Sequence, residues 1–424
     1  MKEHFEILII GGGNAGLSVA SQLLRKKNSL SIGIIEPSEK HYYQPAWTLV
    51  GAGIYDIHKT VRQEKNYIPK NSTWIIDAVT EFMPTENRVL CKSGKEISYN
   101  YLVVSPGIQL DWDKIKGLKE TLGQNNVSSN YLFEFAPKTW EFIENFKGGT
   151  AVFTNPPTPI KCGGAPHKIM YLACDYWKTK GILDKCDVHY VSGGAGIFGV
   201  PEYAETLKEV LKKFKITTHF NSNVTAINGD TKTVEYETKA TDDAIKQSLS
   251  TLDASCYAIA AHDENAETKK VSIKFDLCHA VPPQSAPDFI KKSPLADPDN
   301  PYGFVAVDKY TLQHSHFPNI FSLGDCINAP CSKTGAAIRK QAPVVVANLI
   351  SVMNNEKPTS LYDGYSACPI PTQYGKLMLA EFDYDNKPKM TFPFDQAKPR
   401  WTMWKLKTKV LPWLYWNKIL KGTA

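Results

Sequence analysis

Cys162 is the residue of this sequence whose neighbours most favour chemistry. It lies in the stretch 150–170, TAVFTNPPTPIKCGGAPHKIM, directly after Lys161 and ahead of a helical pattern. A positive neighbour and the N-terminus of a helix both favour the thiolate, which is the nucleophilic and redox-active form of cysteine. We therefore predict a reactive cysteine in a strand–turn–helix setting.

The cysteine content as a whole gives no support for a disulfide scaffold or a zinc site. The sequence has nine cysteines, and none of them forms a C-x-x-C pair. An odd number disfavours a disulfide framework, and the missing spacing disfavours zinc and a thioredoxin-like centre. Any one of these cysteines, taken alone, is more typical of a small buried hydrophobe.

A glycine cluster near the N-terminus has the spacing of a phosphate-binding loop. It follows the apolar run 5–10 and opens a helical pattern, and its glycines are Gly11, Gly13 and Gly16. The next apolar run, 31–35, ends at Glu36, an acid placed to accept hydrogen bonds from ribose hydroxyls. Glycine allows the tight turn and a close approach of pyrophosphate to the helix N-terminus. The pattern predicts a dinucleotide-binding fold.

A second cofactor signature lies nearer the C-terminus. The apolar run 319–323 ends at Gly324 and Asp325, and residues 332–335, SKTG, then open a helix expected to continue to about residue 350. Asp325 can bind the ribityl chain of a flavin, and a helix N-terminus can stabilise negative charge on its reduced ring. The two signatures together predict FAD.

The stretch that contains Cys162 begins a second β-α-β unit. Its elements are a strand at 150–154, a helix at 167–178 and a strand at 187–191. Gly194, Gly196 and Gly199 also match the dinucleotide pattern, but they follow the second strand, whereas a pyrophosphate loop follows the first. Ser192 stands where a ribose-binding acid would be. We therefore expect a nicotinamide-type architecture that does not use NAD(P).

Composition narrows the class of protein. The 424 residues are 42% hydrophobic and 22% charged, with a formal charge of +6, which is too diffuse to indicate a nucleic-acid partner. No run of 18 apolar residues occurs, so no helix is expected to span a bilayer. The first strand begins near residue 5 and leaves no room for a signal or transit peptide, although a processed form would look the same.

Three other segments carry expectations about structure. The aromatic stretch 41–53 suits either a wall over the cofactor, with Gln44 as a polar contact, or a loop packed on the first domain. Residues 114–144 read as a largely polar, helical crossover. Residues 228–270 read as a polar surface excursion, and 271–277 as a strand.

The C-terminal segment 401–420, WTMWKLKTKVLPWLYWNKIL, interleaves four tryptophans with four lysines. Aromatic rings flanked by lysines suit a bilayer interface, because the lysine stems can reach up to lipid phosphates. Pro412 is expected to split the segment into two short pieces. We favour a monotopic membrane anchor; the alternative is a helix docked on the core.

At this point the chain resembles a known family, the sulfide:quinone oxidoreductases, and within it the branch that includes the mitochondrial enzymes. The resemblance covers nearly the whole length. It is carried by the strings IEPSEKHYYQPAWTLVGAG, LVVSPGIQLDWDKIKGL, PIKCGGAPHKIMYL, GAGIFGV, FPNIFSLGDC, SKTGAA, YDGYSACP and AEFDY with TFPFDQ and PWLYWN. It implies an α/β fold with two Rossmann-like dinucleotide-binding domains, as in disulfide-reductase-like flavoproteins, plus an amphipathic C-terminal membrane-anchoring segment.

The resemblance also implies the site. Matching positions give Cys162 and Cys368 as a redox pair, FAD between the domains, and a quinone held near Phe392, Phe394 and the C-terminal aromatics. No cysteine occurs from 92 to 161, which fits the two-cysteine branch without a covalently attached flavin. Around FAD, the matched positions and the glycines of the patterns above give Gly11, Gly13, Asn14, Ala15, Gly16, Glu36, Gln44, Val79, Gly107, Asp325, Lys333, Thr334 and Gly335. No metal is predicted.

The implied reaction is the oxidation of hydrogen sulfide. A disulfide or trisulfide between the two cysteines is attacked by sulfide, which leaves one cysteine as a persulfide and the other as a thiolate. Two electrons pass to FAD and then to a membrane quinone, while glutathione, sulfite, cyanide, coenzyme A or polysulfide takes the sulfur. Family analogy gives the persulfide to Cys162 and the attack on flavin to Cys368; the residues themselves do not assign these roles.

The expected organisation follows from these assignments. Residues 1–115 with 300–360 form the FAD-binding domain, 116–299 the second Rossmann-like domain, and 361–424 the quinone and membrane-interface region. We expect a peripheral protein of a bacterial cytoplasmic membrane, or of the mitochondrial inner membrane if the sequence is a processed form, with room for a homo-oligomer. The rival readings are a membrane NADH:quinone oxidoreductase and a non-catalytic flavoprotein module.

Overall fold

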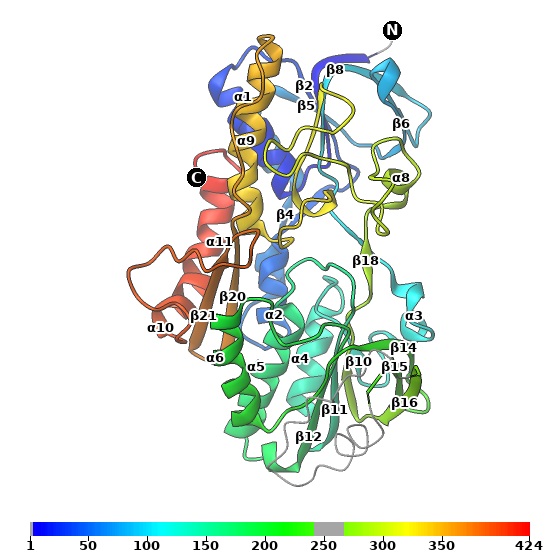
Figure 1. Ribbon diagram of the computed structural model, residues 1–424, viewed down its shortest axis with the longest axis vertical. Coiled ribbons are helices and arrows are strands. Elements are labelled where there is room, and N and C mark those ends of the chain that lie inside the picture. The colour runs from blue at the N-terminus through cyan, green and yellow to red at the C-terminus, as the bar shows by residue number, and fades with distance from the viewer. Residues whose placement is uncertain (1–2, 241–266) are drawn as a thin grey trace.

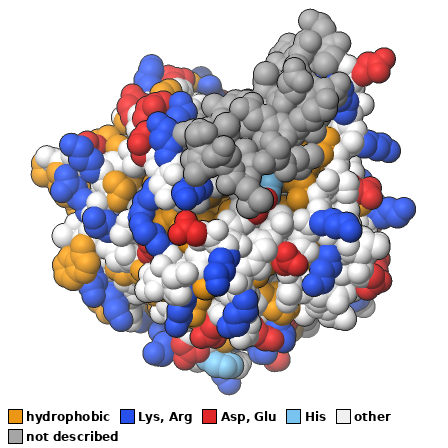
Figure 2. All heavy atoms as spheres, turned by 90° about the horizontal axis from the view of Figure 1, so that it is seen from below, with side chains coloured by type: hydrophobic (Ala, Val, Ile, Leu, Met, Phe, Trp, Pro, Cys, Tyr) orange, Lys and Arg blue, Asp and Glu red, His pale blue; other side chains and the backbone are white. Residues whose placement is uncertain are grey.

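The computed structural model describes residues 3–240 and 267–424. Two α/β units lie one above the other, and the C-terminal part of the chain runs along the side where they meet (Figure 1). On the face at the lower end of the molecule, basic and acidic side chains are interspersed (Figure 2). This face therefore has the diffuse charge that the small net charge predicts.

The upper unit is built on a seven-stranded sheet with the order β5-β2-β1-β8-β7-β6, and β19 pairs with β8. The strands are β1 (Glu3–Ile10), β2 (Ile32–Ile35), β5 (Ser72–Ile75), β6 (Val79–Met83), β7 (Arg88–Cys91), β8 (Glu96–Val104) and β19 (Ile320–Ser322). The pairs among β5, β2, β1, β8 and β19 are parallel. Buried parallel strands read as continuous apolar runs, which is why β1 and β2 were predictable.

Two long helices cover this sheet and bring the cofactor signatures together. They are α1 (Asn14–Lys26) and α9 (Gly335–Met353), which contact each other. Both were predicted, and α9 continues through Pro343 as expected. The loop after β1 and the turn after β19 therefore lie at the same, carboxyl end of the parallel strands, where open α/β sheets bind their ligands.

The lower unit has a five-stranded parallel sheet with the order β10-β17-β11-β12-β13. Its strands are β10 (Val127–Ser128), β17 (Leu277–His279), β11 (Gly149–Asn155), β12 (Cys186–Ser192) and β13 (Thr217–His219), and its helices are α4 (Ala136–Asn145), α5 (Ala165–Thr179) and α6 (Pro201–Phe214). The predicted strand–turn–helix around Cys162 is confirmed as β11, a loop and α5. The glycine cluster at 194–199 does follow the second strand, β12.

Three expectations about the lower unit were wrong. Residues 114–144 are not a helical crossover: only α3 (Leu118–Thr121) and α4 are α-helical there, because Ile115, Leu118 and Val127 are buried in the core. Residues 228–270 are not only a surface excursion. They contribute β15 (Thr233–Thr238) and the start of β16 (Lys269–Lys274), which join β14 (Ser222–Asn228) in an antiparallel sheet. The remainder of that segment, 241–266, lies outside the described residues.

The third wrong expectation is the single strand at 271–277. The chain leaves the antiparallel sheet after β16 and enters the parallel sheet at β17. The smaller elements are β3 (Lys40–Tyr42) paired with β4 (Val61–Gln63), β9 (Gln109–Leu110) paired with β18 (Gln284–Ser285), and the short helices α2 (Trp47–Val50) and α8 (Asp288–Lys291). The β9–β18 pair belongs to the two segments that connect the upper and lower units (Figure 1).

The C-terminal part forms a hairpin and a helix. The hairpin is β20 (Ser366–Gln373) with β21 (Lys376–Phe382). The helix, here called the C-terminal helix, runs without interruption over 401–419 through α10 (Trp401–Lys405), a π-helical turn (Leu406–Val410), α11 (Leu411–Leu414) and a second π-helical turn (Tyr415–Ile419). Pro412 does not split it, since the wide turn before the proline relieves the clash with the preceding carbonyls.

The C-terminal helix docks one face on the protein and exposes the other. Trp404 and Trp416 are buried, whereas Trp401 is 60% and Trp413 is 56% exposed. The expected alternative, a helix docked on the core, is therefore confirmed for one face, and the membrane anchor stays a prediction for the other. Within the described residues, none of the helices has the length and apolar character needed to cross a membrane.

Candidate active site

The site centres on two cysteines that the fold brings together from distant parts of the chain. Cys162 lies in the loop after β11 and has a left-handed backbone with φ +54°. Cys368 lies in β20 and is buried. A Cβ placed on Gly164 would lie only 2.6 Å from Cys368 Sγ, so glycine is what lets the Cys162 loop approach β20. Both cysteines are free thiols in this structure.

A buried lysine lies beside the cysteine pair. Lys168 has no exposed surface, and its Nζ donates to Cys162 Sγ at 3.0 Å. It comes from the first turns of α5, whose residues from Ala165 to Cys174 are all buried. A buried ammonium is costly unless an anion accompanies it. The Cys162 thiolate is the anion that stands at this position.

The electrostatics of the site separate the two thiols. The hydrogen bond from Cys368 and the positive charges of Lys168 and Lys407 hold the pKa of Cys162 well below its usual range, against the effect of burial. The pKa of Cys368 is raised by that same hydrogen bond and by burial. In the reduced pair, Cys162 is therefore the thiolate and Cys368 the thiol that donates to it.

The pKa values of the two lysines at this site, Lys168 and Lys407, shift in opposite directions. Burial alone would lower the pKa of Lys168, but attraction to Cys162 and Cys368 outweighs it and raises the pKa. Burial lowers the pKa of Lys407 to about 8, and its Nζ donates to the Pro45 carbonyl at 3.3 Å. Sequence reasoning did not single out Lys168, and it expected Lys407 among the lysines that reach lipid phosphates, whereas the structure buries Lys407. The available signal was a lysine inside the otherwise apolar helix start APHKIMYLAC.

The loop after β1 has the form that a dinucleotide requires. Gly11 has φ +98°, and a Cβ there would lie 2.5 Å from the Ser105 carbonyl oxygen. A Cβ on Gly16 would collide with the Gly11 carbonyl oxygen, whereas Gly13 faces open space. Helix α1 has no side-chain cap and no acid in its first turn, which leaves free N–H groups for a pyrophosphate. The Asn14 side-chain oxygen is buried without a partner, as expected where a ligand completes the site.

The turn after β19 faces this loop. A Cβ on Gly324 would lie 3.5 Å from the Ala15 Cβ, and one on Gly335 would lie 3.6 Å from Asn14 Nδ2. The Thr334 hydroxyl caps α9 by accepting from Ala337 N at 3.2 Å. Burial raises the pKa of Asp325, which Lys333 and Lys161 oppose. These residues fit the flavin-binding role that we predict for them.

The cofactor loop and the cysteine site share a boundary. Cys162 N donates to the Lys333 carbonyl at 2.8 Å, and Lys161 Nζ donates to Gln44 Oε1 at 2.8 Å. Lys333 is itself buried, with Nζ 3.0 Å from the Ile327 carbonyl oxygen. The predicted residues Gln44, Asp325, Lys333 and Cys162 are thus brought together across the two units.

Two predicted cofactor residues stand further from this boundary. Val79 is buried on the edge strand β6. Gly107 follows β8 with φ +83°, and nothing lies within 4 Å of a Cβ built on it. Their place at the cofactor remains a prediction.

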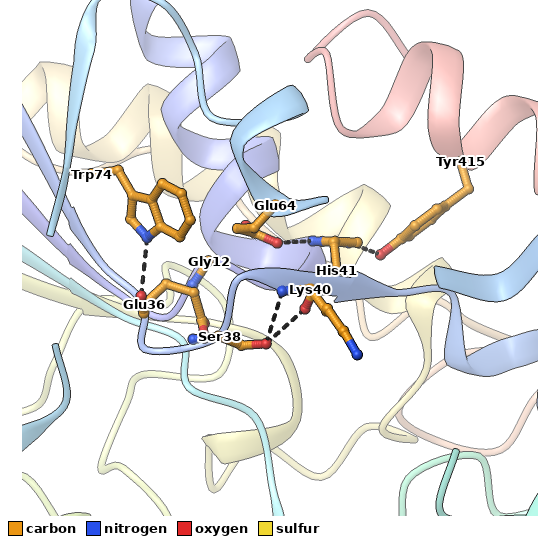
Figure 3. A network of polar contacts seen from close by, with 8 residues as sticks. All are labelled: Gly12, Glu36, Ser38, Lys40, His41, Glu64, Trp74 and Tyr415. Carbon is orange, nitrogen blue, oxygen red and sulfur yellow. Dashed lines mark hydrogen bonds and ion pairs between the residues drawn. The ribbon is translucent and has the colours of Figure 1, made fainter. Parts of the chain in front are cut away.

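Glu36 directly follows β2 and lies beside the glycine loop. Its carboxylate accepts from Gly12 N at 2.8 Å and from Ser38 N at 2.7 Å, and burial raises its pKa despite these bonds. Close by, Glu64 and His41 form a buried pair that reaches Tyr415 of the C-terminal helix (Figure 3). Sequence reasoning named Glu36 but neither of the other two side chains.

The fold and the site together define a flavoprotein of the disulfide-reductase-like class. Residues 5–141 match the pyridine nucleotide-disulphide oxidoreductase family model. The chain is 46% identical, over 100% of its length and 87% of the relative's, to the mitochondrial sulfide:quinone oxidoreductase of Dictyostelium discoideum. It is 41% identical, over 99% of its length and 87% of the relative's, to the mouse mitochondrial enzyme of that name.

A solved structure agrees in fold. The sulfide:quinone oxidoreductase of Aquifex aeolicus superposes with a TM-score of 0.77 at 20% identity, covering 99% of this chain and 92% of that one. The chain belongs to the sulfide:quinone oxidoreductase family. Its cofactor is FAD.

Removal of the buried ammonium tests the electrostatics of the cysteine pair. We expect Lys168→Met to raise the pKa of Cys162 and to slow its alkylation at neutral pH by on the order of tenfold, because the thiolate loses its counter-charge. The measurement is the alkylation rate of the reduced protein as a function of pH. Lys178→Met, on the exposed end of the same helix, is the matched control. An unchanged pH profile for Lys168→Met would contradict the assignment.

Proposed function

We propose that this protein oxidises hydrogen sulfide at Cys162 and Cys368 and delivers the electrons through FAD to a membrane quinone. The observation that carries this is the hydrogen bond from the buried Lys168 to the half-buried Cys162, which lies next to Cys368 and whose backbone N–H donates to Lys333 of the cofactor site. A stabilised thiolate beside a second thiol is the reduced form of a redox couple. Membership of the family supplies sulfide and quinone as the substrates.

The oxidised couple is the electrophile for sulfide. HS⁻ forms a bond to one sulfur of the Cys162–Cys368 disulfide, the disulfide bond breaks, and the other sulfur leaves as a thiolate. The first sulfur then carries a persulfide. A thiolate or another nucleophilic acceptor takes its outer sulfur, and that cysteine returns to the thiolate. Re-forming the disulfide from two thiolates releases two electrons, so the balance requires a two-electron acceptor.

The electrostatics indicate which cysteine leaves. The thiol with the lower pKa is the better leaving group in thiol–disulfide exchange. Cys162 has the lowered pKa and a lysine ready to stabilise its negative charge. We therefore place the persulfide on Cys368 and the thiolate on Cys162, which is the reverse of the assignment that family analogy suggested.

The chain's own residues prepare the electron transfer. FAD, when bound, can accept two electrons from the cysteine couple and pass them to a quinone. Lys333, Asp325 and the N-terminus of α9 are the groups that would hold it. Lys161 is placed between Gln44 and the Cys162 loop, and burial lowers its pKa to about 8. These cations favour negative charge at the boundary between the cofactor site and the cysteines.

A quinone pocket is proposed at the loop that follows β21. Phe392 and Phe394 are stacked with their ring centroids 5.3 Å apart, and they pack on the same apolar cluster as Cys162 and Cys368. The buried Glu381 carboxylate fixes this loop, because it accepts from Thr391 N at 2.8 Å and from Gln396 Nε2 at 2.7 Å. A paired aromatic surface held in place suits a flat quinone ring.

The exposed face of the C-terminal helix is proposed to bind the membrane surface. Trp401, Val410 and Trp413 are the large apolar side chains exposed there, and Lys405 lies 5.1 Å from the Trp401 ring centroid. Such a face places a peripheral protein at the bilayer, where its quinone is dissolved. We propose that this membrane is the mitochondrial inner membrane or the bacterial cytoplasmic membrane.

Two further proposals concern partners. The sulfur acceptor is a small molecule such as glutathione, sulfite, coenzyme A or polysulfide. The protein forms a homo-oligomer.

Loss of either cysteine tests the reaction. We expect Cys162→Ser and Cys368→Ser each to lower sulfide-dependent quinone reduction by at least about a hundredfold, because no redox couple remains. The measurement is steady-state quinone reduction with a short-chain quinone and sulfite as acceptor. Cys186→Ser, a half-buried thiol of the lower unit, is the matched control. Near-normal turnover by either active-site variant would overturn the mechanism.

The position of the persulfide has its own test. We expect one equivalent of sulfide, added without acceptor and followed by alkylation, to leave the extra sulfur on the peptide that contains Cys368. Peptide mass spectrometry distinguishes it from the peptide that contains Cys162. An extra sulfur found on Cys162 would restore the assignment implied by family analogy.

The membrane surface is tested with vesicles of phosphatidylcholine and anionic phospholipid. We expect the double variant Trp401→Ala and Trp413→Ala to weaken vesicle binding by on the order of tenfold or more, because it removes two exposed rings whose apolar surface the bilayer would bury. Co-sedimentation measures the partition. Tyr310→Ala, which removes another exposed aromatic ring outside this helix, is the control, and equal partition of the two variants would refute the assignment.

A further inference from the structure

A buried polar chain connects the C-terminal helix to the interior of the FAD-binding unit. The Tyr415 hydroxyl lies 2.6 Å from His41 Nε2, and His41 Nδ1 lies 2.9 Å from Glu64 Oε2. All three side chains are buried. Figure 3 shows them in line, with Tyr415 on the C-terminal helix, His41 on β3 and Glu64 just after β4. None of them has a part in the sulfur chemistry described above.

The series of polar contacts from Tyr415 through His41 ends at Glu64, which packs against the glycine loop. Glu64 Oε1 is buried without a hydrogen-bond partner and would lie 2.8 Å from a Cβ built on Gly12. The Glu36 side chain crowds the same position, and Gly12 N donates to Glu36. Glu64 therefore packs directly against Gly12 of the glycine loop, and through this contact it can influence the cofactor site.

A second connection joins the end of the C-terminal helix to α1. Ser21 Oγ donates to the Leu420 carbonyl at 2.7 Å, and a Cβ on Gly422 would lie 2.8 Å from Gln22 N. Helix α1 begins at the glycine loop, so its N-terminus faces the pyrophosphate position. The helix end and the polar chain therefore hold the loop and the helix of one dinucleotide site.

Aromatic side chains fix the position of the C-terminal helix against the FAD-binding unit. Trp416 is buried next to Tyr415, with Arg62 4.4 Å from its ring centroid and the Tyr67 ring 5.1 Å away. Arg62 belongs to β4, and Tyr67 follows Glu64 by three residues. If the C-terminal helix left its seat, His41 would lose the Tyr415 hydroxyl and Glu64 would lose the fixed orientation that His41 gives it. A buried carboxylate with fewer partners is strongly disfavoured.

We propose that Tyr415, His41 and Glu64 are positioning residues for FAD, and that seating of the C-terminal helix and binding of FAD stabilise each other. The seated helix holds Glu64 and α1 in the geometry that the loop needs, and bound FAD fixes the loop against which Glu64 packs. Coupling of this kind is reciprocal, so each event strengthens the other by the same factor. If the opposite face of the helix binds a membrane, as proposed above, cofactor retention and membrane attachment share one element.

The first test measures FAD affinity. Apoprotein is prepared from the full chain, and FAD binding is titrated by the quenching of flavin fluorescence for wild type and Tyr415→Phe. We expect the Kd of Tyr415→Phe to be about threefold to tenfold higher, the effect of losing one buried hydrogen bond. The matched control is Tyr236→Phe, which removes a buried tyrosine hydroxyl 3.0 Å from a histidine nitrogen of the lower unit and should bind FAD as wild type does.

The second test measures the reciprocal effect. Hydrogen exchange of the backbone amides in 411–422 reports how often the end of the helix opens. We expect saturating FAD to slow this exchange in wild type, and to slow it by a smaller factor in Tyr415→Phe, where one of the contacts that couple the helix to the loop is missing. Ser21→Ala, which removes the other connection, should also weaken FAD binding.

The outcomes are decisive in both directions. An unchanged FAD Kd in Tyr415→Phe, or exchange in 411–422 that is indifferent to FAD, would overturn the coupling. Neither measurement uses sulfide, quinone or a membrane. Failure of the proposed function would therefore leave these results in place, and failure of the coupling would leave the sulfide chemistry in place.

Discussion

The hydrogen bond between Lys168 and Cys162 is the interaction on which the functional site depends. An ammonium group with no exposed surface can be buried only beside an anion, and a thiol becomes that anion only beside a cation. Each group thus stabilises the charged form of the other, and the hydrogen bond from Cys368 adds to the effect on Cys162. The surrounding structure buries Lys168 and holds the half-buried Cys162 beside it.

Each part of the fold supplies one component of that environment. The parallel sheet of the lower unit directs the loop after β11 toward the upper unit, which puts Cys162 at the carboxyl end of the strands where such sheets gather their ligands. Helix α5 brings Lys168 under the loop. The hairpin β20–β21 brings Cys368, and the C-terminal helix brings Lys407. The site therefore forms only when the loop after β11, α5, the hairpin and the C-terminal helix are all in place.

The sequence allowed the prediction of what is determined locally. Buried parallel strands, the glycine loop and the helix after Cys162 follow from apolar runs, turn residues and helical periodicity, which are properties of neighbouring residues. The failures share a cause. Residues 114–144 are polar enough to suggest a surface helix, yet Ile115, Leu118 and Val127 are buried against a sheet formed much later in the chain. The approach of Cys368 to Cys162, and the burial of Lys168 and Lys407, also depend on long-range contacts, and only the resemblance to a family pointed to the cysteine pair.

The two π-helical turns determine which way each face of the C-terminal helix points. Its buried residues recur about every four positions because the wide turns lengthen the repeat; they are Met403, Trp404, Lys407, Thr408, Pro412, Tyr415 and Trp416. A regular α-helix with 3.6 residues per turn would rotate its stripe steadily away from the protein along this length. The π-helical turns offset this rotation. They keep Lys407 and Tyr415 on the buried face and Trp401 and Trp413 on the exposed face. Insertion or deletion of one residue between Lys407 and Trp413 would rotate one end of the helix relative to the other, so that Lys407 and Tyr415 would no longer lie on the same face.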